Sequence, residues 1–317
     1  MQRTLRKPQR DCIRFFVENV TEETGGYERH IQSIIGELVI TSKQAIKLNL
    51  KSHTQISPYL ETCCLRMSAV VSYENAAAEV KYLTGIEISK SSQQRLIHRQ
   101  DFDWPQAESV VGELSADGGN IRMRTPDGEP SVWRGYKAIC LHDHHAIAAS
   151  FQENILLINW VNEQDLASTV TCLGDGHDGV WNIFKEVATS DSRREILDWY
   201  HLMENLHKIG GSNQRLFAAR SLLWLGKVNE TIELFNDCTL DQAKNFCVYL
   251  EKHRHRIVNY YYLQAEQVCS IGSGSIESTI KQIDRRTQLS GAQWKSENIP
   301  QVLLHRCAYL NGLICDR

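Results

Sequence analysis

Several features that would place the chain in a familiar class are missing from the sequence. No apolar run approaches the roughly 18 residues that a membrane-spanning helix needs, and the longest are short stretches such as 155–161. The basic N-terminal segment has no apolar stretch behind it, so it does not resemble a secretory signal. Phosphate-binding loops of the Walker type and Gly-x-Ser-x-Gly elbows are also absent. We therefore expect a cytoplasmic protein with no membrane partner, and neither ATP-driven nor serine-hydrolase chemistry is indicated.

Paired cysteines are missing as well. The 10 cysteines are scattered, and none forms a Cys-x-x-Cys pair, so a zinc ribbon or finger is not supported. Single cysteines in a chain of this size suit a reducing compartment and are typical of small core residues.

An excess of basic charge is absent too. The 317 residues include 35 basic and 38 acidic ones, a formal net charge of −3. Binding to nucleic acid would therefore need local basic patches. A hydrophobic content of 42% excludes wholesale disorder, and the length suggests two or three compact units.

The first third of the chain reads as a hairpin followed by helices. Residues 36–41 and 45–50 have the pattern of two strands. Helical periodicity follows over 58–71, 72–83 and 91–99, with Ser72 as an N-cap, Gly85 as a stop and a capping box from Ser91 to Gln94. Two helices joined by a tight glycine-containing connector predict a helix-turn-helix, although a helical hairpin with a solvated polar face fits the same pattern.

The last of these helices is the candidate DNA reader. Its outward face is expected to carry side chains that reach phosphates and base edges. These are Lys90, Gln93, Gln94, Arg95 and Arg99.

After a linker near Trp104, the sequence becomes rich in strands and later entirely helical. Interleaved strands and helices predict a mixed α/β layer fold. The predicted organisation is a basic leader with a β-hairpin (1–52), a helix-turn-helix region (53–105), an α/β core in two parts (106–210 and 266–317) and an all-α insertion between those parts (211–265).

Three carboxylates stand at structural breaks. Asp117 and Asp175 each end an expected strand beside glycine, and Glu277 lies in the first turn of a helix behind a Gly-Ser-rich turn. Small neighbours allow a phosphate backbone and hydrated Mg²⁺ ions to approach, and two such ions about 4 Å apart activate phosphodiester chemistry. Taken singly, each acid has a plainer interpretation: Asp-Gly is a common turn, and Glu277 can pair with Lys281 one helical turn away.

Together these acids and their flanking residues carry a resemblance to a known family. The chain from about Gly36 onward is similar to the DDE transposases of bacterial insertion sequences, especially the ISKra type. The matching runs are Ala-Asp117-Gly-Gly, Gly-Asp175-Gly, Leu-Asp198-Trp-Tyr-His201, Gly-Ser-Gly-Ser-Ile-Glu277-Ser, Leu83-Thr-Gly85, Trp294 and Ala308-Tyr-Leu-Asn-Gly312.

The resemblance implies an RNase H-like fold in which Asp117, Asp175 and Glu277 hold two Mg²⁺ ions, with Mn²⁺ able to substitute. It implies cleavage and transfer of double-stranded DNA at element ends and at a target. We then expect a nucleoid-associated protein that is at least a dimer on DNA. Two alternatives stay open: a domesticated, catalytically silent DNA-binding protein, and an RNase H-like nuclease that never joins strands.

Asp198 and His201 resemble the Asp/Cys-x-x-His signature of several transposase superfamilies. By this resemblance His201 has a catalytic role, orienting the scissile phosphate or contacting an acid, while Asp198 rivals Asp175 as second metal ligand. The alternative is a buried pair at a strand end. Members of the ISKra group often carry a zinc ribbon that this sequence lacks, so end recognition is expected to rest on the helices and the basic leader, or the chain is a shortened copy.

Local basic clusters supply further candidate DNA contacts. The run 252–256 is one cluster, and a second follows the last acid. In the second we expect DNA contacts from Lys281, Arg285, Arg286, Trp294 and Lys295. Trp294 can stack on an unpaired base, although such a tryptophan is more often a core anchor. The histidines at 142, 144 and 145 resemble a zinc site only superficially, because no cysteine partner lies at a ligand spacing.

Overall fold

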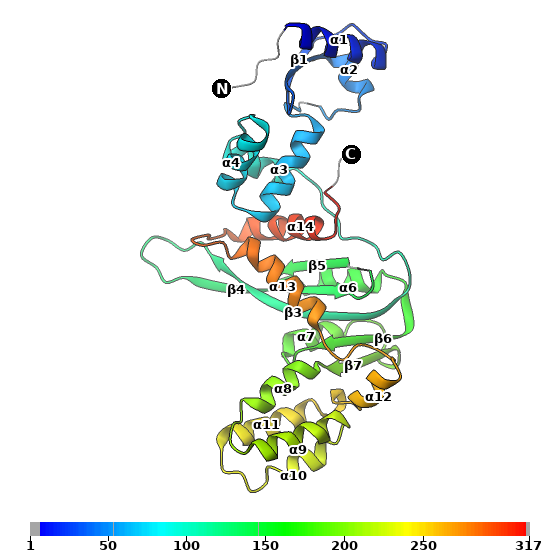
Figure 1. The fold of residues 1–317 in the computed structure, drawn as a ribbon, viewed down its shortest axis with the longest axis vertical. Helices are drawn as coiled ribbons and strands as arrows, with labels where there is room; N and C mark the ends of the chain where they lie inside the picture. The colour runs from blue at the N-terminus through cyan, green and yellow to red at the C-terminus, as the bar shows by residue number, and fades with distance from the viewer. Residues whose placement is uncertain (1–6, 53, 145, 315–317) are drawn as a thin grey trace. The chain divides into compact units, whose positions relative to one another are not determined.

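The computed structural model describes residues 7–52, 54–144 and 146–314, with side chains from residue 11 onward (Figure 1). Residues 1–6 of the basic leader, His53, His145 and the last three residues lie outside this description. The chain divides into two compact units. The first unit comprises Met1–Asp103 with Ala308–Arg317, and the second comprises Trp104–Cys307.

The first unit combines a β-hairpin with helices. Its elements before residue 104 are α1 (Lys7–Thr21), β1 (Glu28–Ser33), β2 (Gly36–Thr41), α2 (Ser42–Lys47), α3 (Pro58–Val70), α4 (Tyr73–Thr84) and α5 (Lys90–His98).

The hairpin predicted from 36–41 and 45–50 is wrong in its second strand. β2 pairs instead with the preceding strand β1, and the following residues form α2. The reason is a capping box: the Thr41 side chain accepts a hydrogen bond from Gln44 N, and Gln44 Oε1 accepts one from Thr41 N at 2.8 Å. Two hydrogen bonds between Thr41 and Gln44 thus begin a helix where the apolar alternation suggested a strand.

The three helices α3, α4 and α5 begin at serine caps. The Ser57, Ser72 and Ser89 side chains each accept a hydrogen bond from a backbone N–H in the following turn. The Ser72 cap is confirmed, whereas the predicted capping box from Ser91 is wrong, because the N-cap of α5 is Ser89, two residues earlier. Gly85 ends α4 with φ +74°, a left-handed conformation that favours glycine. Whether this group acts as a helix-turn-helix stays a prediction.

The second unit is built on a five-stranded sheet. Its strands are β3 (Val111–Met123), β4 (Val132–Leu141), β5 (Ala146–Phe151), β6 (Leu166–Gly174) and β7 (Arg193–Leu197). Its helices are α6 (Asn154–Asn162), α7 (Asp178–Phe184), α8 (Trp199–His207), α9 (Asn213–Trp224), α10 (Val228–Glu233), α11 (Asp241–Lys252), α12 (Tyr260–Ala265) and α13 (Gly274–Thr287). Three short 3₁₀ turns lie at Ser190–Ser192, Arg254–Arg256 and Ser296–Asn298, and α14 (Ile299–Leu310) is the last helix described.

The sheet is mixed, as predicted. Its spatial order is β5-β4-β3-β6-β7. β3, β4 and β5 are antiparallel neighbours, whereas β3, β6 and β7 run parallel. The mixed α/β class is therefore confirmed. Because β3 and β6 are parallel, their carboxyl ends point toward the same edge of the sheet.

Asp117 does not end a strand, contrary to the sequence prediction. β3 continues through Gly118 and Gly119, which pair with Lys137 and Tyr136 of β4. A Cβ on Gly119 would lie 2.5 Å from the Tyr136 ring, so this glycine makes room for the neighbouring aromatic side chain. The two glycines thus allow close packing inside a strand, where the sequence suggested a turn.

Helices cover both faces of this sheet (Figure 1). On one face Tyr136 donates a hydrogen bond to Asp284 of α13 at 2.9 Å. On the other, Ile139 and Leu141 join a buried cluster with Trp181 of α7. Tyr136 and Ile139 point to opposite faces because side chains alternate along a strand. The strand β5 and the helix α6 were not among the predicted elements.

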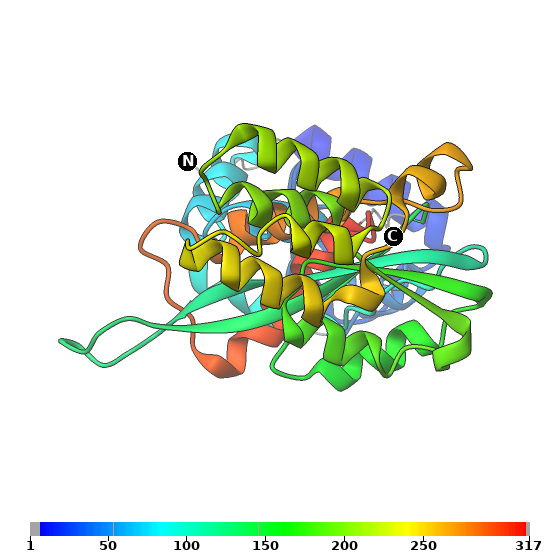
Figure 2. The same cartoon turned by 90° about the horizontal axis from the view of Figure 1, so that it is seen from below.

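The segment predicted to be entirely helical, 211–265, consists of α9 to α12 with short connections. Figure 2 shows these helices, coloured yellow-green to yellow, grouped together. Phe235 and Phe246 join the same buried cluster as the sheet residues, so this helical segment and the sheet share a core. Along the described ranges, no helix has the length and apolar character needed to cross a bilayer.

Candidate acidic site at the sheet edge

Adjacent strands bring Asp117 and Asp175 together. Ala116 of β3 pairs with Gly174 of β6, so the residues that follow each of them are neighbours. Burial raises the pKa of Asp117, and the nearby negative charge of Asp175 raises it further. The site therefore holds two neighbouring carboxylates in which the charge of Asp175 disfavours ionisation of Asp117, an arrangement that a bound cation would relieve.

Glu277 joins this site through His201. Glu277 lies in the first turn of α13, and His201 in the first turn of α8. His201 Nδ1 lies 3.9 Å from Glu277 Oε1. The contact with Asp198, whose Oδ1 lies 3.2 Å from His201 Nδ1, is the main cause that raises the pKa of His201 to about 9, and the charges of Asp175 and Glu277 add to it. His201 is therefore held as a cation among the acids at neutral pH.

Asp198 has different surroundings. It caps α8, and its side chain is completely buried. Its oxygens accept hydrogen bonds from His201 N at 2.7 Å, from Ser273 Oγ at 2.7 Å and from Ser273 N. Burial alone would raise the pKa of Asp198, but the hydrogen bonds from His201 and Ser273 hold it below its ordinary value.

One trio of side chains has the geometry of a metal site. In the described ranges, ligand atoms of Asp198, His201 and Glu277 lie within 4.8 Å of one another. This trio differs from the predicted set, because it includes Asp198 and His201 and lacks Asp117 and Asp175. The two predicted acids outside the trio are linked to it electrostatically, since Asp175 raises the pKa of His201 and His201 lowers the pKa of Asp117.

The sequence did not identify two side chains that lie beside the acids, Tyr249 and Lys137. Gly176, directly after Asp175, has φ +106°, and a Cβ there would lie 2.8 Å from the Tyr249 hydroxyl. Lys137 lies over Gly118, and its charge partly lowers the pKa of Asp117. Asp-Gly signals a tight turn in the sequence, but nothing in the motif identifies the side chains that pack on it.

The basic run 252–256 packs against the α/β core. Arg256 Nε lies 2.7 Å from Glu195 Oε2, and its guanidinium stacks 4.0 Å from the centre of the Trp181 ring. Lys252 Nζ lies 2.6 Å from Asp178 Oδ1. The Arg256 guanidinium is buried, so this run attaches the helical segment to the sheet. Fewer of its charges are then available to neutralise DNA.

The candidate DNA contacts that follow the last acid separate into two groups. Lys281, Arg285 and Lys295 are exposed, and Lys281 Nζ lies 3.6 Å from Glu277 Oε2. Arg286 is 1% exposed, and its guanidinium lies 4.9 Å from the centre of the Trp294 ring, whose Nε1 donates to Thr287 O at 2.7 Å. In this structure Arg286 and Trp294 pack together inside the unit. Trp294 is thus arranged as a core anchor, the second of the two roles considered from the sequence.

The candidate DNA-reading face of α5 is partly exposed. Lys90 and Arg95 are exposed, and Gln94 is half-buried. Arg99 pairs with Glu61 at 3.1 Å. Gln93, expected to point outward, is fully buried and accepts a hydrogen bond from Ser68 at 3.1 Å. The exposed cations of α5 are therefore Lys90 and Arg95, with Arg99 already paired.

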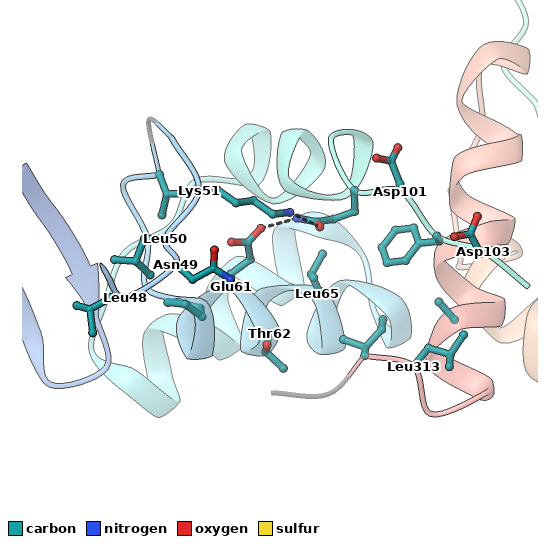
Figure 3. A pocket seen from close by; sticks show the side chains of 16 residues that line it. Leu48, Asn49, Leu50, Lys51, Glu61, Thr62, Leu65, Asp101, Asp103 and Leu313 are labelled. Carbon is teal, nitrogen blue, oxygen red and sulfur yellow. Dashed lines mark hydrogen bonds between the residues drawn. The ribbon is translucent and has the colours of Figure 1, made fainter. Parts of the chain in front are cut away.

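Two other features carry no comparable chemistry. His142 contacts Ser115 Oγ at 2.9 Å and Glu113 Oε2 at 3.4 Å, and it belongs to no metal-type cluster within the described ranges. A pocket of about 710 Å³ in the first unit is lined by leucines, acids and Lys51 (Figure 3). There Lys51 donates to Gln100 at 3.3 Å, and Gln100 donates to Glu61.

No protein-family model matches the chain, and a search of the curated proteins finds no match.

Proposed function

We propose that this protein is a DDE-type transposase with an RNase H-like core, which binds the ends of an insertion sequence and cleaves and transfers DNA strands. The observation that carries the proposal is the electrostatic coupling of His201 to acids from three distant segments. Asp175 after β6 and Glu277 from α13 raise the pKa of His201, and His201 lowers the pKa of Asp117 in the middle of β3. Their order along the chain is the order in the transposases that the sequence resembles.

The sheet supports the same proposal. An antiparallel β5-β4-β3 set continued by two parallel strands places the middle of β3, at Asp117, beside the end of β6. An all-α segment then separates β7 from the helix that carries the last acid. Such a layout brings sequence-distant carboxylates to one edge, which is what a metal-dependent phosphoryl transfer needs.

The donor set fits hard divalent ions. Asp117, Asp175 and Glu277 are partly exposed, carry oxygen ligands and are candidates to hold Mg²⁺ or Mn²⁺. When bound, a pair of such ions would activate the attacking hydroxyl and stabilise the leaving oxygen. In this proposal His201, a cation 3.9 Å from Glu277, orients a phosphate oxygen or the Glu277 carboxylate.

The test is cleavage of a DNA duplex carrying the element's terminal repeat, with Mg²⁺ or Mn²⁺. We expect Asp117→Asn and Glu277→Gln each to lower nicking by at least about a thousandfold. Each change removes a negative charge that would hold the metal ions acting on the attacking hydroxyl and the leaving oxygen. Asp284→Asn is the matched control, since Asp284 lies on the same helix as Glu277 and binds Tyr136. If either acid variant cleaves like the control, the catalytic assignment is wrong.

Separate assays distinguish the alternatives. Nicks without joined products would indicate a nuclease that never transfers strands. Sequence-selective binding that survives the loss of all three acids, without metal-dependent nicking in the unmodified protein, would indicate a silent DNA-binding protein. Exposed Lys90 and Arg95 on α5 favour a binding role, and replacing either by alanine should reduce the salt dependence of DNA affinity by about one unit of slope.

A further inference from the structure

The surroundings of Asp198 bear on how Glu277 is placed. The Asp198 carboxylate is completely buried, whereas the Glu277 side chain is 34% exposed. One Asp198 oxygen accepts from Ser273 N and from Ser273 Oγ, and the other accepts from His201 N. A metal ion that bound Asp198 would have to compete with these donors and with His201 Nδ1, which lies 3.2 Å from the second oxygen. Displacing Ser273 would leave its donors buried and unpaired.

Ser273 connects this carboxylate directly to Glu277. Ser273 is the residue before α13, and its carbonyl oxygen accepts a hydrogen bond from Glu277 N at 3.1 Å. The same residue therefore binds Asp198 through its N–H and hydroxyl and binds the first helical turn through its carbonyl. Movement at Ser273 would move the backbone of Glu277.

Further contacts make this connection tight. Trp199 N donates to Ile271 O at 3.0 Å, and Asp198 N donates to Gly174 O, directly before Asp175, at 2.8 Å. A Cβ on Gly272 would lie 2.5 Å from the Tyr200 ring, so the two segments touch without space between them. The end of β7 is thus tied both to the Asp175 loop and to the turn before α13.

We infer that Asp198 is a positioning residue: it joins the end of β7 to the turn before α13 and so holds Glu277 beside the other acids, and it does not bind the metal. The inference rests on the proposed function for the role of Glu277. Asp198 and Ser273 are 75 positions apart in sequence, and the chain between them forms the helical segment α8–α12. The hydrogen bond joins the two ends of this helical segment. Glu277 therefore stays next to the end of β7 although the helices α8–α12 lie between them in the sequence.

The experiment compares Ser273→Ala, Asp198→Asn and the double variant with the unmodified protein. Mn²⁺ affinity is measured by electron paramagnetic resonance, and amide hydrogen exchange is followed over 274–278. Tyr136→Phe is the matched control, because it removes one hydrogen bond to Asp284 on the same helix and leaves Asp198 and Ser273 intact.

If Asp198 positions Glu277, Ser273→Ala weakens Mn²⁺ binding by about tenfold and speeds exchange over 274–278, since a hydrogen bond to a charged group is lost. Asp198→Asn has the larger effect, and Ser273→Ala then adds little to it, because both changes break one connection. Tyr136→Phe leaves Mn²⁺ affinity unchanged.

If Asp198 is a metal ligand, Ser273→Ala leaves Mn²⁺ affinity unchanged or raises it, because an oxygen is released for the ion, and the inference is overturned. Failure of the proposed function has a different signature, since the unmodified protein then binds no Mn²⁺ at the acids. Exchange still decides the positioning role in that case. Faster exchange in Ser273→Ala than in Tyr136→Phe supports it, and equal exchange overturns it.

Discussion

The ends of β6 and β7 lie side by side, and each is followed by an aspartate, yet the two aspartates have opposite surroundings. Asp175 is half-buried, binds the backbone N–H of His177 at 2.8 Å and lies beside Asp117. Asp198 is fully buried and surrounded by donors. The same residue type at the same structural position is left open to solvent in one case and satisfied internally in the other.

This difference distinguishes a carboxylate available to bind a cation from a carboxylate that stabilises the fold. A carboxylate held near another negative charge, with few donors, favours a cation that comes from outside the chain. A carboxylate that accepts several hydrogen bonds in the interior already has its partners and stabilises the fold instead. We therefore expect substitutions at the two ends to affect different measurements.

The largest effect is expected at the β6 end. Under the proposed function, Asp175→Asn should lower metal-dependent nicking by at least about a thousandfold, because the proposed metal site loses one of its charges. Its thermal unfolding midpoint should stay the same or rise, since repulsion with Asp117 is relieved. Nicking assays and calorimetry on one preparation check both parts. If Asp175→Asn were strongly destabilised, Asp175 would be a structural carboxylate like Asp198, and the contrast between the two strand ends would be wrong.

At the β7 end we expect loss of stability. Asp198→Asn should lower the free energy of unfolding by about 3 kcal/mol, because buried donors on Ser273 and His201 lose a charged acceptor. Urea unfolding followed by circular dichroism measures the change. A loss below about 1 kcal/mol would show that the buried carboxylate is not structural.

The pH dependence of stability should originate at the β7 end. The folded pKa of His201 is raised from its ordinary 6.5 to about 9, chiefly by Asp198. The stability from this pair is therefore complete below pH 6.5 and is lost as pH rises through about 9. We expect the unmodified protein to lose about 2 kcal/mol across this window relative to His201→Gln. If both proteins lost the same free energy of unfolding across this pH range, the pH dependence would not come from His201.

The smallest effect concerns the loop after Asp175. Gly176 (φ +106°) and Gly128 (φ +87°) both have left-handed backbone, but only Gly176 lies against a side chain, Tyr249. Both changes to alanine strain the backbone, and Gly176→Ala should cost about 1 kcal/mol more, because it also displaces Tyr249. Unfolding midpoints of the two variants, measured side by side, test this difference.

The comparison also shows which parts of the site could be predicted from the sequence. Helix starts at Pro58 and after Ser72 and the stop at Gly85 follow from hydrogen bonds and backbone preferences within a few residues, so they were predicted. The error at 45–50 has the same local scale: Thr41 and Gln44 form a capping box that apolar alternation obscured.

Long-range partners were not predictable in this way. Asp198 meets Ser273 after 75 positions, and Arg256 meets Glu195 after 61. Neither pair leaves a spacing pattern, because the contact depends on how strands and helices pack. The same applies to Arg286, which the sequence suggests as a surface cation and the structure buries against Trp294.

The mixed α/β class, the helical segment 211–265 and the positions of the three acids beside glycines or a helix start could be read from the amino-acid order, because they depend on composition and on neighbours along the chain. Which aspartate is satisfied internally and which basic residues stay exposed became clear from the folded structure. Burial and hydrogen bonding to a carboxylate depend on residues brought together by packing, and sequence spacing carries almost no information about them.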